Sequence, residues 1–346
     1  MKISRVAIVA VAGLMLVPTL ALATSESPVL TSRQNEFLPS RGDGFLAWSQ
    51  NSRRHPRHYD TYARRDGRSP FKVNPAGSVG WSGGIDGTSL IEQVVTHRGD
   101  QSDLELFDLV SRTQSNPPAG IDTRIWEWKP STSGDQILFG RNNINIGRHE
   151  FQAVILFDTT TGRSRILALV RRNAAFTDLQ PGQVNGDWAT WERCLPGIRH
   201  CNVFLYQIST RTTSMLPNPS LQQYNGGVTA DGTVYYVRTG QHDRWKCGAS
   251  SKIVRQPAAG SSTVIANLPK GKDSFALFAY TEPDGSTTLF FDQVSCSTGR
   301  WDVFKILDAD TATGLAPAAR VPGGGPGTAP TGIAGPTRPS YSSRAG

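Results

Sequence analysis

The stretch that decides the fold is WKPSTSGDQILF, residues 128–139, in which a Gly-Asp turn precedes a run of strand-forming residues. Six such turns occur at intervals of 43 to 53 residues: Asp43-Gly44, Asp86-Gly87, Gly134-Asp135, Gly186-Asp187, Asp231-Gly232 and Asp284-Gly285. Each turn is followed by a short apolar run, such as Ile137-Leu138-Phe139. Six units of this length, each too small to bury its own apolar face, predict the blades of a closed β-propeller.

Composition supports an all-β globular fold. The chain has 346 residues, of which 38% are hydrophobic and 18% are charged, a balance that argues for a packed core and against a disordered chain. Its 35 glycines and 22 prolines are too many for a helix bundle and suit short strands joined by turns. A β-sandwich or a two-domain β protein is the alternative architecture.

Two openings carry a family resemblance. Trp81-Ser82 and Trp128-Lys129-Pro130-Ser131, each just before a turn, resemble the W-S-P-D-G opening of TolB-type, WD40-like repeats. The second strands, for example Asp103-Leu104-Glu105-Leu106, are similar to that family's polar residue followed by a hydrophobic strand. The proline is missing in most units and the turn is reversed in two. The resemblance implies a TolB-like scaffold and leaves the function open.

The remaining segments have distinct compositions. Lys2 and Arg5 precede an uncharged apolar run that ends at Ala23, which predicts a cleaved signal peptide over residues 1–23, with an uncleaved membrane anchor as the alternative. Residues 24–39 form an N-terminal segment that could supply a closing strand, and residues 40–315 form the propeller. Residues 316–346 are rich in Pro, Gly and Ala and predict a disordered tail. We expect no transmembrane segment after signal cleavage, and a secreted or periplasmic protein.

Four cysteines, Cys194, Cys201, Cys247 and Cys296, suit two disulfides in an oxidising compartment. We predict the pairs Cys194–Cys201 and Cys247–Cys296. Their spacing does not match a structural zinc site, in which Cys or His pairs usually lie two to four residues apart.

Basic residues gather in the first unit, at Arg53, Arg54, Arg57, Arg64, Arg65 and Arg68. This cluster could dock an anionic surface, such as a phosphate-bearing envelope polymer or a lipid headgroup layer. An ordinary solvated loop explains it equally simply.

Histidine, arginine and tryptophan recur in the loops between the first and second apolar strands, which we expect to share one face. They are His97, Arg98, Arg148, His149, Arg199, His200, His242, Arg244, Trp245, Arg300 and Trp301. Loops on a rigid scaffold often carry function, so these residues predict a ligand-binding rim. We predict neither a metal nor a cofactor, because a metal site would need imidazoles from different blades to meet at one ion.

Four further charged residues, Arg141, Glu192, Arg238 and Asp292, end inner strands and could face the central channel, or could form ion pairs with one another. The sequence also contains G-x-S-x-G at Gly80-Trp81-Ser82-Gly83-Gly84, but a strand is expected after it where a nucleophile elbow needs a helix. We therefore assign no catalytic residue.

These features predict a secreted, non-enzymatic propeller that binds a protein or a cell-envelope polymer through one loop face. Nucleic acid is not an expected partner. The alternative is an extracellular polysaccharide lyase or hydrolase, because titratable side chains such as Glu192, His149 and His200 could converge in the propeller mouth.

Overall fold

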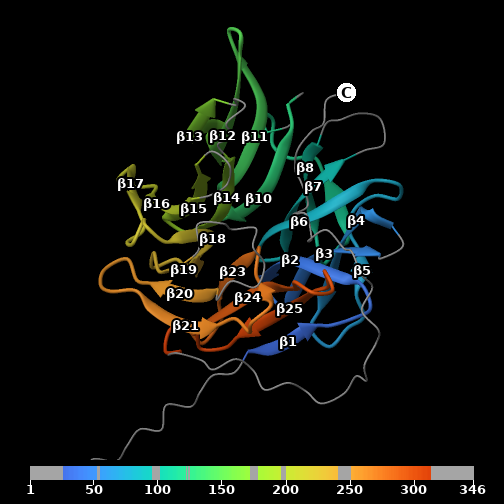
Figure 1. Ribbon diagram of the computed structural model, residues 1–346. Coiled ribbons are helices and arrows are strands. Elements are labelled where there is room, and N and C mark those ends of the chain that lie inside the picture. The colour runs from blue at the N-terminus through green and yellow to red at the C-terminus, as the bar shows by residue number, and fades with distance from the viewer. Residues whose placement is uncertain are drawn as a thin grey trace, which may run out of the picture.

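The structure is a computed structural model that describes residues 26–52, 55–95, 102–121, 123, 125–171, 178–195, 200–240 and 251–312. Six antiparallel sheets stand around a common centre as blades (Figure 1). The described residues contain strands and turns and no helix. The predicted all-β, six-bladed propeller is therefore confirmed.

Blades 1 to 5 are four-stranded meanders whose strands follow chain order from the centre outward. Blade 1 consists of β2 (Asn35–Gly42), β3 (Phe45–Ser52), β4 (His55–Arg65) and β5 (Phe71–Lys72). Blade 2 consists of β6 (Val79–Asp86), β7 (Ser89–Val95), β8 (Ser102–Asp108) and β9 (Thr113–Ser115). Blade 3 consists of β10 (Glu127–Ser133), β11 (Gln136–Ile146), β12 (His149–Asp158) and β13 (Arg163–Arg171).

Blade 4 consists of β14 (Asp178–Asn185), β15 (Trp188–Cys194), β16 (Cys201–Gln207) and β17 (Thr212–Met215). Blade 5 consists of β18 (Gln222–Val228), β19 (Val234–Thr239), β20 (Lys252–Gln256) and β21 (Thr263–Asn267).

Blade 6 joins the two ends of the described chain. It contains β22 (Lys272–Asp273), β23 (Leu277–Thr281), β24 (Thr287–Ser295) and β25 (Trp301–Ile306), and both β22 and β23 pair with β24. The N-terminal strand β1 (Ser27–Leu30) pairs antiparallel with β25 and is the outermost strand of this blade. Since β2 opens blade 1 only a few residues later, the N-terminal segment ties blade 6 to blade 1.

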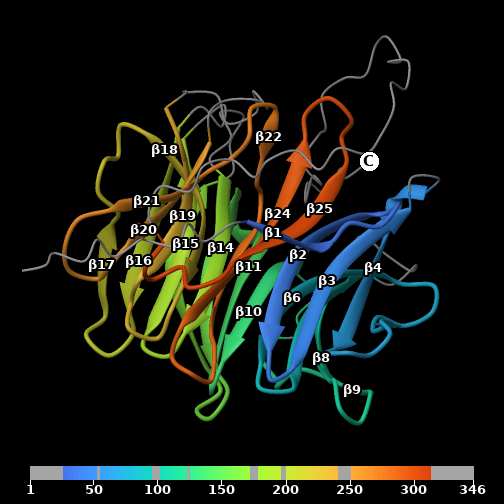
Figure 2. The same cartoon turned by 90° about the horizontal axis from the view of Figure 1, so that it is seen from below.

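The six turns found in the sequence connect the innermost strand of each blade to its second strand. The glycine of every turn has a positive φ, from 54° at Gly134 to 88° at Gly285. Glycine suits these positions because a Cβ atom disfavours left-handed backbone. The order Gly-Asp in two units therefore serves the same hairpin as Asp-Gly. We call the face with these turns the turn face, and the opposite face the loop face; the strands run between them (Figure 2).

Apolar clusters fill the space between neighbouring blades. The second strands are buried on both sides: all five central residues of β7 are buried, as are the first four of β19. One cluster unites Tyr224 and Tyr235 of blade 5 with Phe291 of blade 6. This explains why the runs after the turns are continuously apolar rather than alternating.

The predicted signal peptide, residues 1–23, and the predicted tail, residues 316–346, lie outside the described residues. Within the described part of the chain, no helix is long and apolar enough to cross a lipid bilayer.

Candidate functional site in the central channel and at its two faces

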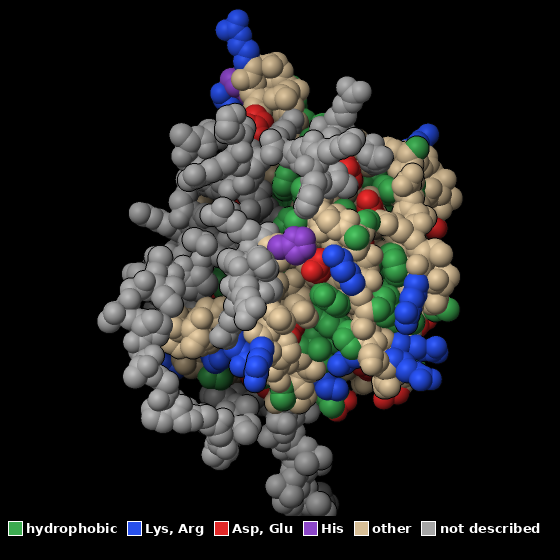
Figure 3. All heavy atoms as spheres, turned by 90° about the vertical axis from the view of Figure 1, so that its right-hand side faces the viewer, with side chains coloured by type: hydrophobic (Ala, Val, Ile, Leu, Met, Phe, Trp, Pro, Cys, Tyr) green, Lys and Arg blue, Asp and Glu red, His purple; other side chains and the backbone are tan. Residues whose placement is uncertain are grey.

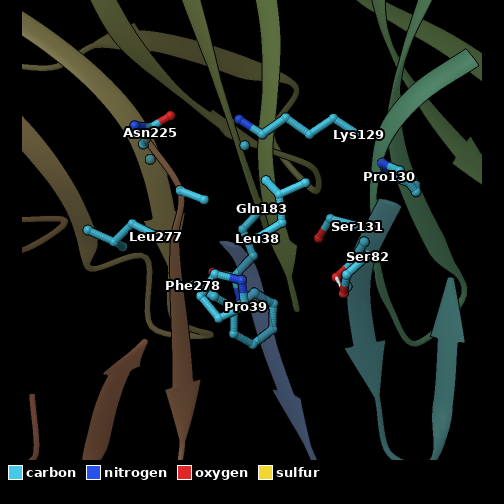
Figure 4. A pocket seen from close by; sticks show the side chains of 15 residues that line it. Leu38, Pro39, Ser82, Lys129, Pro130, Ser131, Gln183, Asn225, Leu277 and Phe278 are labelled. Atoms are coloured by element: carbon cyan, nitrogen blue, oxygen red, sulfur yellow. Dashed lines mark hydrogen bonds between the residues drawn. The ribbon is translucent and has the colours of Figure 1, made fainter. Parts of the chain in front are cut away.

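The innermost strands of all six blades surround a central channel. A small pocket of about 50 Å³ lies within it. Figure 4 shows that Leu38, Lys129 and Asn225 reach it from different sides, with the Lys129 side chain extending across toward the wall that carries Asn225. The channel is narrow because backbone and small residues from several blades meet there.

Leu38, Lys129 and Asn225 share an unusual backbone conformation. Their φ angles are 51°, 48° and 56°, in the left-handed region that costs a non-glycine residue about 1–2 kcal/mol. Each lies where the inner strand of blade 1, 3 or 5 slips its register against the second strand. This bulge turns the three side chains to the channel.

Side chains from the intervening blades hold these bulges in place. The Lys129 N–H donates to Gln93 Oε1 at 3.3 Å, and the Asn225 N–H donates to Glu192 Oε2 at 3.2 Å. The Leu38 N–H makes a longer contact of 3.5 Å with Asp292 Oδ2. Blades 2, 4 and 6 thus supply the acceptors for blades 3, 5 and 1, so the channel has approximate threefold symmetry.

Blades 2 and 4 have glycines at the equivalent bulges. A Cβ atom on Gly182 would lie 2.3 Å from Thr190 Oγ1 and 2.5 Å from the carbonyl oxygen of Gly226. A Cβ atom on Gly83 would lie 2.4 Å from the carbonyl oxygen of Ile91. Only glycine allows the inner strands to approach this closely.

Asp292 is a buried acidic group of the channel wall. It also accepts the N–H groups of Phe275 at 2.7 Å and Ala276 at 2.9 Å. Burial raises the pKa of Asp292 to about 6, although these N–H groups and the charge of Lys129 favour the ionised form. Its contacts show that it organises the channel wall.

Asp292 is one of the four charged residues predicted at the channel, and it lies in the channel wall. The other three lie in separate surroundings. Arg141 pairs with the buried Glu127, with 3.0 Å between Nε and Oε1, and donates to the Ile121 carbonyl at 3.1 Å. Glu192 is only 2% exposed and holds the Asn225 backbone. Arg238 lies near Tyr236 of the same strand. Arg141 and Glu192 therefore support the structure of the blades.

The predicted disulfide between Cys194 and Cys201 is confirmed, and it links directly opposed residues of β15 and β16. Cys296 is also disulfide-bonded, while Cys247 lies outside the described residues. Glu192 and the two linked sulfurs form the one group of metal-type ligands in the described part of the chain. Neither sulfur is a thiolate there, so this group lacks the ligands a metal would need.

The structure describes only some of the predicted loop-face residues. Arg148 and His149 are exposed at the tip of the β11–β12 hairpin. His200 contacts the Pro219 carbonyl through Nε2. His97, Arg98, Arg199, His242, Arg244 and Trp245 lie outside the described residues, so the rim as a whole stays a prediction.

Arg300 and Trp301 belong to the closure between blades 6 and 1. Arg300 bonds Asp302 at 3.0 Å and donates to the Thr31 and Ser32 carbonyls at 3.0 and 2.9 Å. Trp301 is 8% exposed and packs against the rings of Phe37 and Phe275. A single tryptophan beside an arginine gave no sequence signal for this packing role.

The basic cluster of the first unit is only partly described. Arg65 and Arg68 are exposed on blade 1, with Arg65 stacked 5.9 Å from the Phe45 ring centre, and Arg64 is half-buried. Arg53 and Arg54 lie outside the described residues, as does the side chain of Arg57. Figure 3, which looks onto this side of the molecule, shows Lys and Arg side chains in separate groups among acidic ones.

Ser82, the centre of the G-x-S-x-G sequence, lies inside strand β6. Its backbone N–H donates to Ser49 Oγ at 2.8 Å, and a turn and strand β7 follow it. It therefore lacks the strand-to-helix turn of a nucleophile elbow.

A funnel of about 250 Å³ opens the channel at the turn face, and the sequence analysis did not identify it. Arg41 lines it and forms a bidentate salt bridge with Asp66, in which Nη1–Oδ1 and Nη2–Oδ2 are 2.7 and 2.6 Å apart. The hydrogen bonds and charge of Asp66 raise the pKa of Arg41. Arg41 looks in the sequence like one more basic residue near the first cluster, and only the fold brings it to the channel.

A scan against protein-family models found no match, and a search of curated protein sequences also found none. Among solved structures, a putative TolB from Agrobacterium tumefaciens is similar, with a TM-score of 0.52 and 12% identity over 80% of this chain and 91% of that chain. A structure from a study of two prolyl endopeptidases has a TM-score of 0.52 and 15% identity over 85% of this chain. This chain covers only 42% of that peptidase. The protein therefore has the fold of a TolB-like six-bladed β-propeller.

Proposed function

We propose that this protein is a non-enzymatic binding propeller of the cell envelope, and that blade 3 docks its protein partner. The observation that carries the proposal is the length of this blade. Strands β11 and β12 have 11 and 10 residues, compared with eight and 11 in β3 and β4 and seven each in β7, β8, β15 and β16. Their hairpin projects outward from the propeller body (Figure 1), and its tip carries Arg148 and His149.

The outer strand of the same blade offers an edge for strand addition. β13 has nine residues, compared with two to five in β5, β9, β17 and β21, and no described strand pairs with its outer edge. Such an edge presents unpaired backbone N–H and C=O groups to another chain. Ile166 and Leu169 on this strand are 55% and 41% exposed, and Arg163 and Arg171 lie at its ends. An extended segment with apolar and acidic residues fits this edge.

Export to the envelope is supported by the apolar N-terminal run and by the disulfide chemistry. Disulfides persist in oxidising compartments and are rare in the cytosol. The Cys194–Cys201 bond therefore favours a periplasmic or secreted location.

The test is capture of envelope proteins by the exported, full-length mature chain, followed by cross-linking and identification of the contact peptides. We expect one partner to cross-link to blade 3 and to be lost with Ile166→Lys/Leu169→Lys and weakened with Arg148→Ala/His149→Ala. Met215→Lys is the matched control, because Met215 is 46% exposed on β17, the edge strand of blade 4. Equal capture by the β13 variant and the control, at equal thermal stability, would overturn the proposal.

The alternative, a polysaccharide lyase or hydrolase, makes a separate prediction. Mature protein would release products from envelope polysaccharides, and Glu192→Gln would abolish the release. Glu192 is buried and accepts the Asn225 backbone N–H, which is a structural role. We therefore propose binding rather than turnover.

A further inference from the structure

A cavity lies on the turn face between blades 5 and 6, and no residue of blade 3 lines it. Its volume is about 450 Å³, compared with about 250 Å³ for the turn-face funnel. This is within the usual range for small-molecule sites, about 300–1,000 Å³. Of its lining residues, only Asp231 and Gly285 stood out in the sequence, as members of turns.

Arg255 supplies hydrogen-bond donors to one wall of the cavity. It lies on β20, directly opposite Tyr235 of β19 in the sheet register. Arg255 is half-buried, and the described residues give its guanidinium no ion pair and no hydrogen bond. Its Nε atom is buried, so the terminal NH₂ groups are the donors that a ligand or water can satisfy.

Asp310 and Asp231 supply acceptors to the cavity. Asp310 accepts the Tyr235 hydroxyl at 3.0 Å through Oδ1 and the Thr287 N–H at 3.1 Å through Oδ2. Asp231 accepts the Thr233 N–H at 3.1 Å and the hydroxyl groups of Thr229 and Thr233. Burial opposes ionisation of Asp231, but these hydrogen bonds together hold its pKa below the usual value. Both carboxylates keep acceptor capacity for a ligand, since each oxygen can accept two bonds.

Apolar surface completes the cavity. Pro257, Ala230 and the Tyr235 ring line it together with the charged groups. Tyr235 is 1% exposed, and burial followed by the Asp310 charge raises its pKa well above the usual value, so its hydroxyl stays a donor to Asp310. The aromatic ring is thus fixed in place.

We propose that this cavity binds a neutral sugar ring. It combines a donor-only group, Arg255, with acceptor-only carboxylates that do not pair with it. A hydroxyl group both donates and accepts, so neighbouring hydroxyls of one sugar satisfy Arg255 and Asp310 at once. The C–H face of the ring would pack on Pro257, which lines the cavity. Arg255 is outnumbered in the lining by Asp231 and Asp310, so the cavity disfavours an anionic ligand.

The experiment titrates the mature protein with free glucose, galactose, mannose and N-acetylglucosamine, using calorimetry and ligand-detected NMR. We expect at least one to bind, and Arg255→Met and Asp310→Asn each to weaken it about tenfold or more, since one such hydrogen bond contributes about 1.4 kcal/mol or more. Arg64→Met is the matched control, because Arg64 is half-buried on blade 1 and does not line the cavity. Thermal unfolding of each variant verifies its fold.

Three results would overturn the proposal. One is the absence of binding for all four sugars, and another is unchanged affinity in folded Arg255→Met and Asp310→Asn. The third is tighter binding of glucuronate or glucosamine than of any neutral sugar, which would assign the cavity to a charged ligand. Loss of sugar binding would leave the blade 3 capture experiment unaffected, because the two surfaces share no residue.

Discussion

Glu92, on β7, is a carboxyl group that the fold buries completely. It is 0% exposed, and neither carboxyl oxygen has a hydrogen-bond partner among the described residues. Burial raises the pKa of Glu92 to about 8, and Glu105, directly opposite on β8, adds to the rise. The folded state therefore keeps the Glu92 proton up to a higher pH than the unfolded chain does, because the usual pKa of this group is near 4.5.

This difference makes stability fall as pH rises. Between about pH 4.5 and 8 Glu92 binds less proton in the unfolded chain than in the folded one, so its contribution to wild-type stability declines by at most ~1.4 kcal/mol per pH unit. Glu92→Gln removes this loss, and we expect the variant to gain stability over wild type at pH 8 but little at pH 5. Urea unfolding of the wild type and the variant at both pH values measures this difference in unfolding free energy. The same difference at pH 5 and pH 8 would show that Glu92 does not titrate in this window.

At the scale of the strand, the inner strands depend on glycine where blades approach each other. Gly182→Ala would place a methyl group against Thr190 and the Gly226 backbone, which cannot move without disturbing β18. We expect a loss of roughly 1–3 kcal/mol of unfolding free energy, the usual cost of overpacking.

Gly240→Ala is the control for that measurement, because no atom lies within 4 Å of its added Cβ. Chemical unfolding of both variants should show a loss for Gly182→Ala and almost none for the control. Equal stability of the two variants would contradict the close approach of β14 and β18.

At the scale of the molecule, closure of the ring depends on one short strand. Val29 and Leu30 of β1 pack against a cluster that contains Leu46 and Trp48 of blade 1 and Phe290 of blade 6. We expect Val29→Ser/Leu30→Ser to cost about 1–3 kcal/mol in lost apolar burial. Hydrogen exchange should quicken in both β25 and β2–β3, because blades 6 and 1 lose their common partner.

Val110→Ser is the control for this variant, since Val110 is 62% exposed and outside the closure. Faster exchange confined to residues 27–30 would mean that β1 is an appendage and that the ring closes without it.

The sequence by itself determined the elements and the architecture. The Asp-Gly and Gly-Asp turns and the continuous apolar runs after them are local signals, because turn conformation and strand burial depend on neighbouring residues. They were enough to give six blades and an all-β fold. The pairing of Cys194 with Cys201 was also predictable, because the two residues are close in sequence and end adjacent strands.

Only the tertiary structure decided which side chains meet. The bulges at Leu38, Lys129 and Asn225 are held by residues from other blades, and no local sequence pattern predicts such partners. Arg255, Asp310 and Asp231 come from three separate segments and line one cavity only because blades 5 and 6 stand side by side. Trp301, which resembled a rim residue, packs in the closure for the same reason. Blade formation is local, whereas a site between blades depends on how the ring closes.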